Sequence, residues 1–133
     1  MIIRDYTDYR EDEVLALYES VGWTNYLQRA ERLPAAFRGS LCVLGAWEDG
    51  QLVGLLRAVG DGVTILFVQD LLVLPDYQRR GIAAALVRTL CGRYPSVYQI
   101  ELLTDDTEQT RAFYHALGFA AAEEIGCTSF VRM

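Results

Sequence analysis

The chain has 133 residues and a formal net charge of −6 at neutral pH, with 52% hydrophobic and 23% charged residues. This length predicts one domain, residues 1–133, with a hydrophobic core of its own. The acidic balance and the lack of a basic patch argue against nucleic acid as a partner. No apolar run is long enough to cross a bilayer, and no signal peptide is recognisable. We therefore expect no membrane partner and a cytoplasmic location.

The spacing of apolar residues predicts helices and strands throughout the chain. We expect Gly22 to close the first helix, Thr24 or Asn25 to be the N-cap of a second helical pattern, and Pro34 to break or restart it. The order β-α-α-β-β-β-α-β-α-β-β predicts an α/β fold with helices flanking a mixed, mostly antiparallel sheet. The main expected elements are strand 2–6, helix 12–21, strands 41–47, 52–59 and 63–74, helix 81–93, strand 97–103, helix 106–117, and closing strands 120–124 and 128–132.

The three cysteines, Cys42, Cys91 and Cys127, are odd in number and widely spaced. This pattern matches neither a disulfide framework nor a zinc site. We expect reduced cysteines that pack as small hydrophobic residues, and no metal.

A short basic turn with a glycine joins the strand 63–74 to the helix 81–93. The first N–H groups of a helix have no intrahelical partner, and the helix dipole adds partial positive charge there. Gly81 lets a phosphate oxygen approach the backbone, and Arg79 and Arg80 can pair with phosphate oxygens. These features predict a pyrophosphate site, although the spacing matches neither the dinucleotide fingerprint nor the Walker loop.

This turn resembles the acyl-CoA loop of the GNAT superfamily of N-acetyltransferases, whose pattern Gln/Arg-x-x-Gly-x-Gly/Ala reads here as Gln78-x-x-Gly81-x-Ala83. A second family element, Phe/Leu-Tyr-x-x-x-Gly-Phe, is matched by Phe-Tyr-His-Ala-Leu-Gly-Phe at residues 113–119. The predicted order of elements is also the GNAT order, so the resemblance covers nearly the whole chain. It implies acetyl-CoA as cosubstrate.

The resemblance also implies which residues contact acyl-CoA. The backbone of the strand before the loop should bind the pantetheine arm, and the loop N–H groups should bind the pyrophosphate. Thr107 and Thr110 stand where the family often has Asn and Ala, and the Asn touches pantetheine. The expected contacts are Leu71, Val73, Gln78, Arg79, Arg80, Gly81, Ile82, Ala83 and Thr107.

Tyr114 is the candidate general acid. In the family the tyrosine at this position often faces the cofactor sulfur, and a phenol can donate a proton to a leaving thiolate. The alternative is an incidental tyrosine on a helix whose Phe113 and Leu117 are core residues. The neighbouring His115 is expected at the surface. We expect Asp105 and Glu108 to form a capping box in an acidic helix start.

Asp70 is the candidate general base, since it is a carboxylate inside an apolar strand, on the face shared with Val68 and Leu72. Burying a charge is costly unless it has a partner or a task, and apolar surroundings would raise its pKa. Two alternatives stay open. Asp70 could pair with an arginine such as Arg57 across the hairpin, or the amine could lose its proton through a water chain.

The acceptor wall of the family is built between its first two helices, where this chain has Trp23, Asn25 and Tyr26. The resemblance implies that these residues bind substrate, whereas ordinary packing explains the two aromatic residues equally well. An acidic surface favours a cationic acceptor.

The leading hypothesis is an N-acetyltransferase that moves an acetyl group from acetyl-CoA to a primary amine by direct attack in a ternary complex. The acceptor would be a small molecule or a peptide. The alternative is a non-catalytic acyl-CoA-binding sensor or interaction module. Thr128–Arg132 could form a sheet edge that pairs with a second copy, so we also expect a homodimer.

Overall fold

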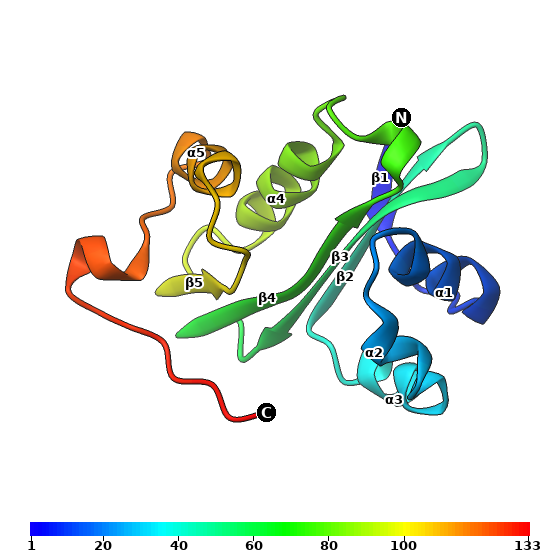
Figure 1. The fold of residues 1–133 in the computed structure, drawn as a ribbon, viewed down its shortest axis with the longest axis horizontal. Helices are drawn as coiled ribbons and strands as arrows, with labels where there is room; N and C mark the ends of the chain where they lie inside the picture. Colours follow the sequence, from blue (N-terminus) through cyan, green and yellow to red (C-terminus); the bar gives the residue numbers. More distant parts are fainter. The chain divides into compact units, whose positions relative to one another are not determined.

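Five strands in the order β1-β2-β3-β4-β5 form the sheet. They are seen in a computed structural model that describes residues 1–133, as two parts, 1–103 and 104–133. β1 to β4 pair antiparallel and β5 pairs parallel with β4, which confirms the mixed, mostly antiparallel sheet (Figure 1). The strands are β1 (Ile2–Asp5), β2 (Cys42–Glu48), β3 (Gln51–Gly60), β4 (Ile65–Val73) and β5 (Gln99–Leu102).

The two faces of this sheet are covered by different helices (Figure 1). On one face α1 (Glu11–Ser20) buries Val14, Leu17 and Tyr18 in a cluster that includes Leu55 and Leu72. Each aliphatic side chain fully buried there contributes roughly 1.5–3 kcal/mol of transfer free energy. The short helices α2 (Thr24–Leu27) and α3 (Leu33–Arg38) lie on the same side.

The opposite face is covered by α4 (Ile82–Arg93), which approaches β3 closely at Gly54. A Cβ on Gly54 would lie 3.1 Å from the Ile82 side chain and 3.3 Å from that of Leu86. This contact fixes the N-terminal end of α4 against the sheet and therefore fixes the loop that precedes it.

The connection from α1 to α2 is a tight turn around Gly22, which has φ of +80°. The Gly22 N–H donates to the Glu19 carbonyl and the Trp23 N–H to the Tyr18 carbonyl, the bonds of a Schellman motif. Trp23 is the N-cap residue of α2, and its side chain makes no capping hydrogen bond. The prediction of Thr24 or Asn25 as N-cap was therefore wrong. The predicted restart at Pro34 is confirmed, because Pro34 lies in the first turn of α3.

The edge between β4 and β5 is only partly closed. β5 pairs with β4 from Ile65 to Val68 and no further. On its other side β4 continues to pair with β3, with a register shift that leaves Gln69 as the extra residue of a bulge. The C-terminal half of β4 therefore has one edge without a strand partner.

Residues 104–133 contain α5 (Glu108–Ala116) and a 3-10 helix at Ala122–Ile125. Thr107 is the N-cap of α5 and forms the capping box with Thr110, so the box predicted for Asp105 and Glu108 was wrong by two residues. Gly118 has φ of +91° and ends the helix in a second Schellman motif.

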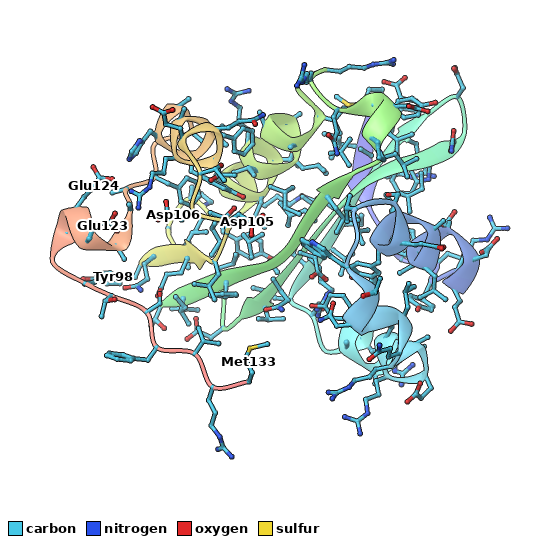
Figure 2. The ribbon with its side chains drawn as sticks, viewed as in Figure 1. Tyr98, Asp105, Asp106, Glu123, Glu124 and Met133 are labelled. Carbon is cyan, nitrogen blue, oxygen red and sulfur yellow. The ribbon has the colours of Figure 1, made fainter.

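The two predicted closing strands, 120–124 and 128–132, are not formed. The Glu124 side chain accepts the Ala121 N–H and Gly126 closes the turn with φ of +77°, which makes residues 122–125 helical. Residues 128–133 are exposed and their backbone groups pair with no strand (Figure 2). Strand propensity is realised only where a partner edge satisfies the backbone, and these residues make no such pairing.

None of the helices has the length and the apolar character needed to cross a bilayer.

Candidate functional site

The loop between β4 and α4 presents free backbone donors. Gly81 is the N-cap of α4 with φ of +80°, and the first helical hydrogen bond runs from the Ala85 N–H to the Gly81 carbonyl at 3.0 Å. The N–H groups of Ile82, Ala83 and Ala84 consequently have no acceptor within the helix. A Cβ on Gly81 would meet no atom within 4 Å, so the space above this turn is open.

Three side-chain contacts hold this loop in place. Gln78 Nε2 donates to the Val73 carbonyl at 3.1 Å, which ties the loop back to the end of β4. The Arg80 guanidinium lies 5.0 Å from the centre of the Tyr77 ring, and the Tyr77 hydroxyl donates to Gln51 at 3.3 Å. Gln78 therefore stabilises the loop itself.

The unpaired edge of β4 leads directly to this loop. The Leu74 N–H donates to the Val53 carbonyl of β3 at 2.8 Å. Since backbone groups alternate in direction along a strand, those of Leu71 and Val73 point to the opposite, open edge. The Gln78 contact with the Val73 carbonyl agrees with that direction. Both residues proposed to bind pantetheine thus face the open edge.

Asp70 is fully buried on the α1 face of β4, with 0% of its surface exposed. Its Oδ2 accepts hydrogen bonds from the Tyr18 hydroxyl at 2.6 Å and from Arg57 Nε at 2.7 Å. Its Oδ1 accepts one from the Tyr26 hydroxyl at 3.2 Å. The ion pair with Arg57, one of the alternatives for Asp70, is confirmed. A catalytic role of Asp70 stays a prediction.

Tyr18 and Arg57 both keep the protons that they donate to Asp70, because the pKa of each is raised. Burial, and after it the Asp70 carboxylate, raise the pKa of Tyr18, so its hydroxyl keeps its proton. Burial lowers the pKa of Arg57, but the Asp70 carboxylate outweighs it and the pKa is raised overall. The buried site therefore holds one cation and one anion.

An aromatic cluster covers this network from the α2 side. The Tyr26 ring centre lies 4.7 Å from that of Tyr18 and 6.4 Å from that of Trp23. The Tyr26 hydroxyl also accepts a hydrogen bond from Gln69 Nε2 at 3.1 Å. Trp23 and Tyr26 are half-buried, and Asn25 is exposed. Of the three predicted acceptor residues, Tyr26 contacts the predicted base, and Trp23 packs against Tyr18 and Tyr26.

Tyr114 and Thr107 belong to the part 104–133, which is described by itself. The half-buried Tyr114 ring packs edge-on against Phe113 at 4.9 Å and Phe119 at 5.8 Å, and burial raises the pKa of its phenol. The Thr107 hydroxyl accepts the Thr110 N–H at 3.1 Å, so the two residues that depart from the family pattern cap the helix together. His115 is exposed, as predicted.

Acidic side chains of this part bond to His115 and Arg111. His115 Nε2 lies 2.6 Å from Glu124 Oε1, and Arg111 forms ion pairs with Asp106 at 2.6 Å and with Glu123 at 2.7 Å. Asp106, Glu123 and Glu124 are labelled in Figure 2. These pairs join α5 to the segment before it and to the 3-10 helix after it.

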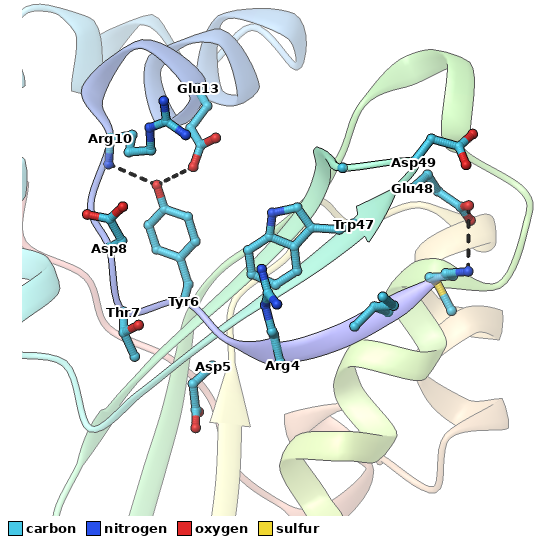
Figure 3. A pocket seen from close by; sticks show the side chains of 13 residues that line it. Arg4, Asp5, Tyr6, Thr7, Asp8, Arg10, Glu13, Trp47, Glu48 and Asp49 are labelled. Atoms are coloured by element: carbon cyan, nitrogen blue, oxygen red, sulfur yellow. Dashed lines mark hydrogen bonds and ion pairs between the residues drawn. The ribbon is translucent and has the colours of Figure 1, made fainter.

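A separate pocket lies between β1, β2 and the start of α1 (Figure 3). In it the Arg4 guanidinium stacks 4.4 Å from the Trp47 ring, and the Tyr6 hydroxyl donates to Glu13 at 2.7 Å. None of the residues predicted to bind acyl-CoA or the acceptor lines this pocket.

Sequence reasoning missed two members of the Asp70 network, Tyr18 and Gln69. Tyr18 lies on the buried face of α1, where a hydroxyl needs a partner, and that position was an available signal. No feature of the sequence around Gln69 indicates its role. Gln69 is exposed by a bulge, and the bulge is visible only in the pairing register of β3 and β4.

Comparison with known proteins identifies the family. A sequence profile of the acetyltransferase (GNAT) family matches residues 4–119. The chain belongs to the GNAT family of acetyltransferases. A solved GNAT acetyltransferase from Streptococcus pneumoniae is 39% identical and superposes with a TM-score of 0.89 over 99% of this chain and 96% of that one. The predicted GNAT fold class is thereby confirmed.

Two further matches differ in length and similarity. The histone acetyltransferase TAP1 of Glycine max is 32% identical over 84% of this chain and 52% of its own length, so the chain spans about half of that curated relative. AAC(6')-Iy, solved with the bisubstrate analogue CoA-S-monomethyl-acetylneamine, is 20% identical, with a TM-score of 0.70 over 99% of this chain and 97% of that one. That likeness concerns the fold alone.

Proposed function

We propose that this chain is an acetyl-CoA-dependent N-acetyltransferase that acts on a primary amine by direct attack in a ternary complex. The observation that carries the proposal is the start of α4, where free N–H groups and open space at Gly81 adjoin an unpaired edge of β4. Backbone donors at a helix N-terminus suit a pyrophosphate, and an unpaired strand edge suits the amide groups of a pantetheine arm.

Acetyl-CoA would supply the thioester that carries the acetyl group. The N–H groups of residues 79–83 would bind its phosphates, assisted by the exposed Arg79 and Arg80. The open-edge backbone groups of Leu71 and Val73 would orient the arm, and a backbone N–H of β4 would donate to the carbonyl oxygen as charge develops there. Thr107 is proposed as a further contact.

Tyr114 is proposed as the general acid. Because burial raises its pKa, the phenol keeps its proton at neutral pH and can donate it from Oη to the leaving sulfur. Asp70 is proposed as the second catalytic residue, on the acceptor side of the site. Its carboxylate is held in place by Arg57 and Tyr18.

The alternative is a non-catalytic acyl-CoA-binding sensor or interaction module. The ion pair between Arg57 and Asp70 supports this alternative, because it explains the buried Asp70 carboxylate without a catalytic role. Tyr114→Phe separates the two functions: an enzyme should lose rate while keeping its affinity for CoA, whereas a sensor would bind and respond unchanged.

Calorimetric titration of acetyl-CoA tests the proposal directly. Gly81→Glu places a bulky anion where the phosphates would bind, and should abolish binding. Gly81→Ala is the matched control, because it brings the same backbone strain of about 1–2 kcal/mol at a positive φ without the charge. Wild-type protein that does not bind acetyl-CoA, or a Gly81→Glu variant that binds as tightly as Gly81→Ala, would refute the site.

The remaining expectations are proposals of the same kind: a small-molecule or peptide amine as acceptor, a homodimer and a cytoplasmic location. The strand edge first expected at residues 128–132 is not formed, but β5 has an outer edge without a partner strand. Sedimentation at micromolar concentration tests the dimer, and a single species of 15.0 kDa would contradict it.

A further inference from the structure

Tyr26 has one unused hydrogen-bonding position. A phenolic hydroxyl has one proton to donate and two lone pairs with which to accept. The Tyr26 hydroxyl donates to Asp70 Oδ1 at 3.2 Å and accepts from Gln69 Nε2 at 3.1 Å. One lone pair is left, on a side chain that is only half-buried, beside the exposed Gln69.

The direction of the Tyr26 proton is fixed by Asp70. Asp70 Oδ2 already accepts from Tyr18 and Arg57, whereas Oδ1 accepts from Tyr26 alone. The bond to Asp70 Oδ1 points the Tyr26 proton inward, toward the buried ion pair of Asp70 with Arg57, and the free lone pair of the Tyr26 oxygen is turned away from Asp70.

This oxygen lies beside Gln69, at the start of the unpaired edge of β4. Gln69 is the bulge residue directly after the last pair between β4 and β5, which ends at Val68. Leu71, whose backbone faces the open edge, comes two residues later, about 7 Å along the strand. Bulges next to active sites re-aim side chains, and here the bulge aims Gln69 at Tyr26.

The surroundings favour a cationic donor over a neutral one. The Trp23 ring lies beside Tyr26, with 6.4 Å between the two ring centres, and ring faces attract ammonium groups. A phenolic oxygen whose proton is bound to a carboxylate is a stronger acceptor than a free phenol, because hydrogen bonds in a chain polarise one another. An ammonium group offers N–H donors and charge at once.

We propose that the Tyr26 hydroxyl oxygen docks the nitrogen of the acceptor, a primary aliphatic amine that binds as ammonium and gives one proton to water before it attacks, with Asp70 and Gln69 as positioning residues. This inference rests on the proposed acetyltransferase function and assigns the acceptor side of the same site. It gives Asp70 the role of orienting Tyr26 in place of the role of free base.

Steady-state kinetics with benzylamine and spermidine as acceptors, followed by thiol release from acetyl-CoA, test the assignment. Tyr26→Phe keeps the ring and removes the oxygen, so it should raise KM for both amines by about tenfold or more, with KM for acetyl-CoA unchanged. The exposed Gln69→Ala should raise KM for the amines by a smaller factor. Tyr98→Phe, at a tyrosine that is 82% exposed, should leave both KM values unchanged.

The outcomes separate this inference from the proposed function. Absence of acetyl-CoA binding to the wild type in calorimetry would remove both. If acetyl-CoA binds and the amines are acetylated but Tyr26→Phe leaves KM for the amines unchanged, only the docking role of Tyr26 is overturned. If acetyl-CoA binds but neither amine is acetylated at millimolar concentration, acetyl transfer to these amines is overturned together with the docking role. Equal rises in KM for amine and acetyl-CoA would also contradict it, because they indicate a structural effect.

Discussion

Arg57 and Asp70 stand opposite each other on β3 and β4, and their side chains form a fully enclosed ion pair with 2.7 Å between Arg57 Nε and Asp70 Oδ2. The pair sits directly beside the bulge at Gln69, where β3 and β4 lose their regular register. A buried pair of this kind fixes which residues face each other, because any slip would leave two unpaired charges in the core.

Removing one member of this pair should destabilise the protein strongly. Asp70→Asn leaves the buried Arg57 guanidinium without a counterion, and we expect a loss of about 3–5 kcal/mol in the free energy of unfolding, measured by urea denaturation. Replacing both residues, as Arg57→Met with Asp70→Leu, should recover much of that loss.

The matched control is the exposed pair of Arg93 and Asp5. Their side chains are 39% and 57% exposed, so solvent screens the interaction and Asp5→Asn should cost less than about 1 kcal/mol. Equal losses for Asp5→Asn and Asp70→Asn would contradict the distinction between the buried and the exposed pair.

The sequence predicted the parts of the site that depend on local signals. The strand, the break at residues 75–77, the turn around Gly81 and the helix after it follow each other within about thirty residues, and each has its own composition. The pairing of Arg57 with Asp70 could also be anticipated, because a hairpin places its two strands in a countable register.

The contacts of Tyr18 and Tyr26 with Asp70 could not be predicted in the same way. They join residues 52 and 44 positions apart, and their formation depends on how α1 and α2 pack on the sheet. The closing strands at 120–124 and 128–132 were predicted from composition and were wrong. A capping glutamate and a left-handed glycine make the first segment helical, and the second segment makes no backbone pairing with a strand.

Acid should weaken the turn between β3 and β4 through Asp61. Its carboxylate accepts the N–H groups of Val63, Thr64 and Ile65 and the Thr64 hydroxyl, which lowers its pKa well below the usual range. A lowered pKa in the folded state gives stability that is fully present above the unfolded value of about 4 and is lost as the pH falls below it.

The stability difference between wild type and Asp61→Asn should accordingly be largest near neutral pH and should shrink below about pH 4. Thermal melts over this range measure it. Asp8→Asn, at an exposed aspartate that receives no backbone N–H, is the control and should show no comparable change with pH. A difference for Asp61→Asn that stays constant down to pH 2 would contradict this account.

Tyr114 should control the rate of acetyl transfer without controlling the binding of acetyl-CoA. Tyr114→Phe keeps the ring that packs against Phe113 and Phe119 and removes only the proton donor, so kcat should fall by about 100-fold or more. Because burial raises the pKa of this phenol, the wild-type kcat should not decline with deprotonation of Tyr114 until above about pH 10.

Thiol release across pH, corrected for the spontaneous hydrolysis of acetyl-CoA, measures this dependence, and calorimetry measures the affinity of both proteins for CoA. Phe119→Leu removes an aromatic neighbour and keeps the hydroxyl, so it should lower kcat far less than Tyr114→Phe. A Tyr114→Phe variant with wild-type kcat would remove the general acid from the mechanism. The thiolate would then have to take its proton from water or from the amine that has just been acylated.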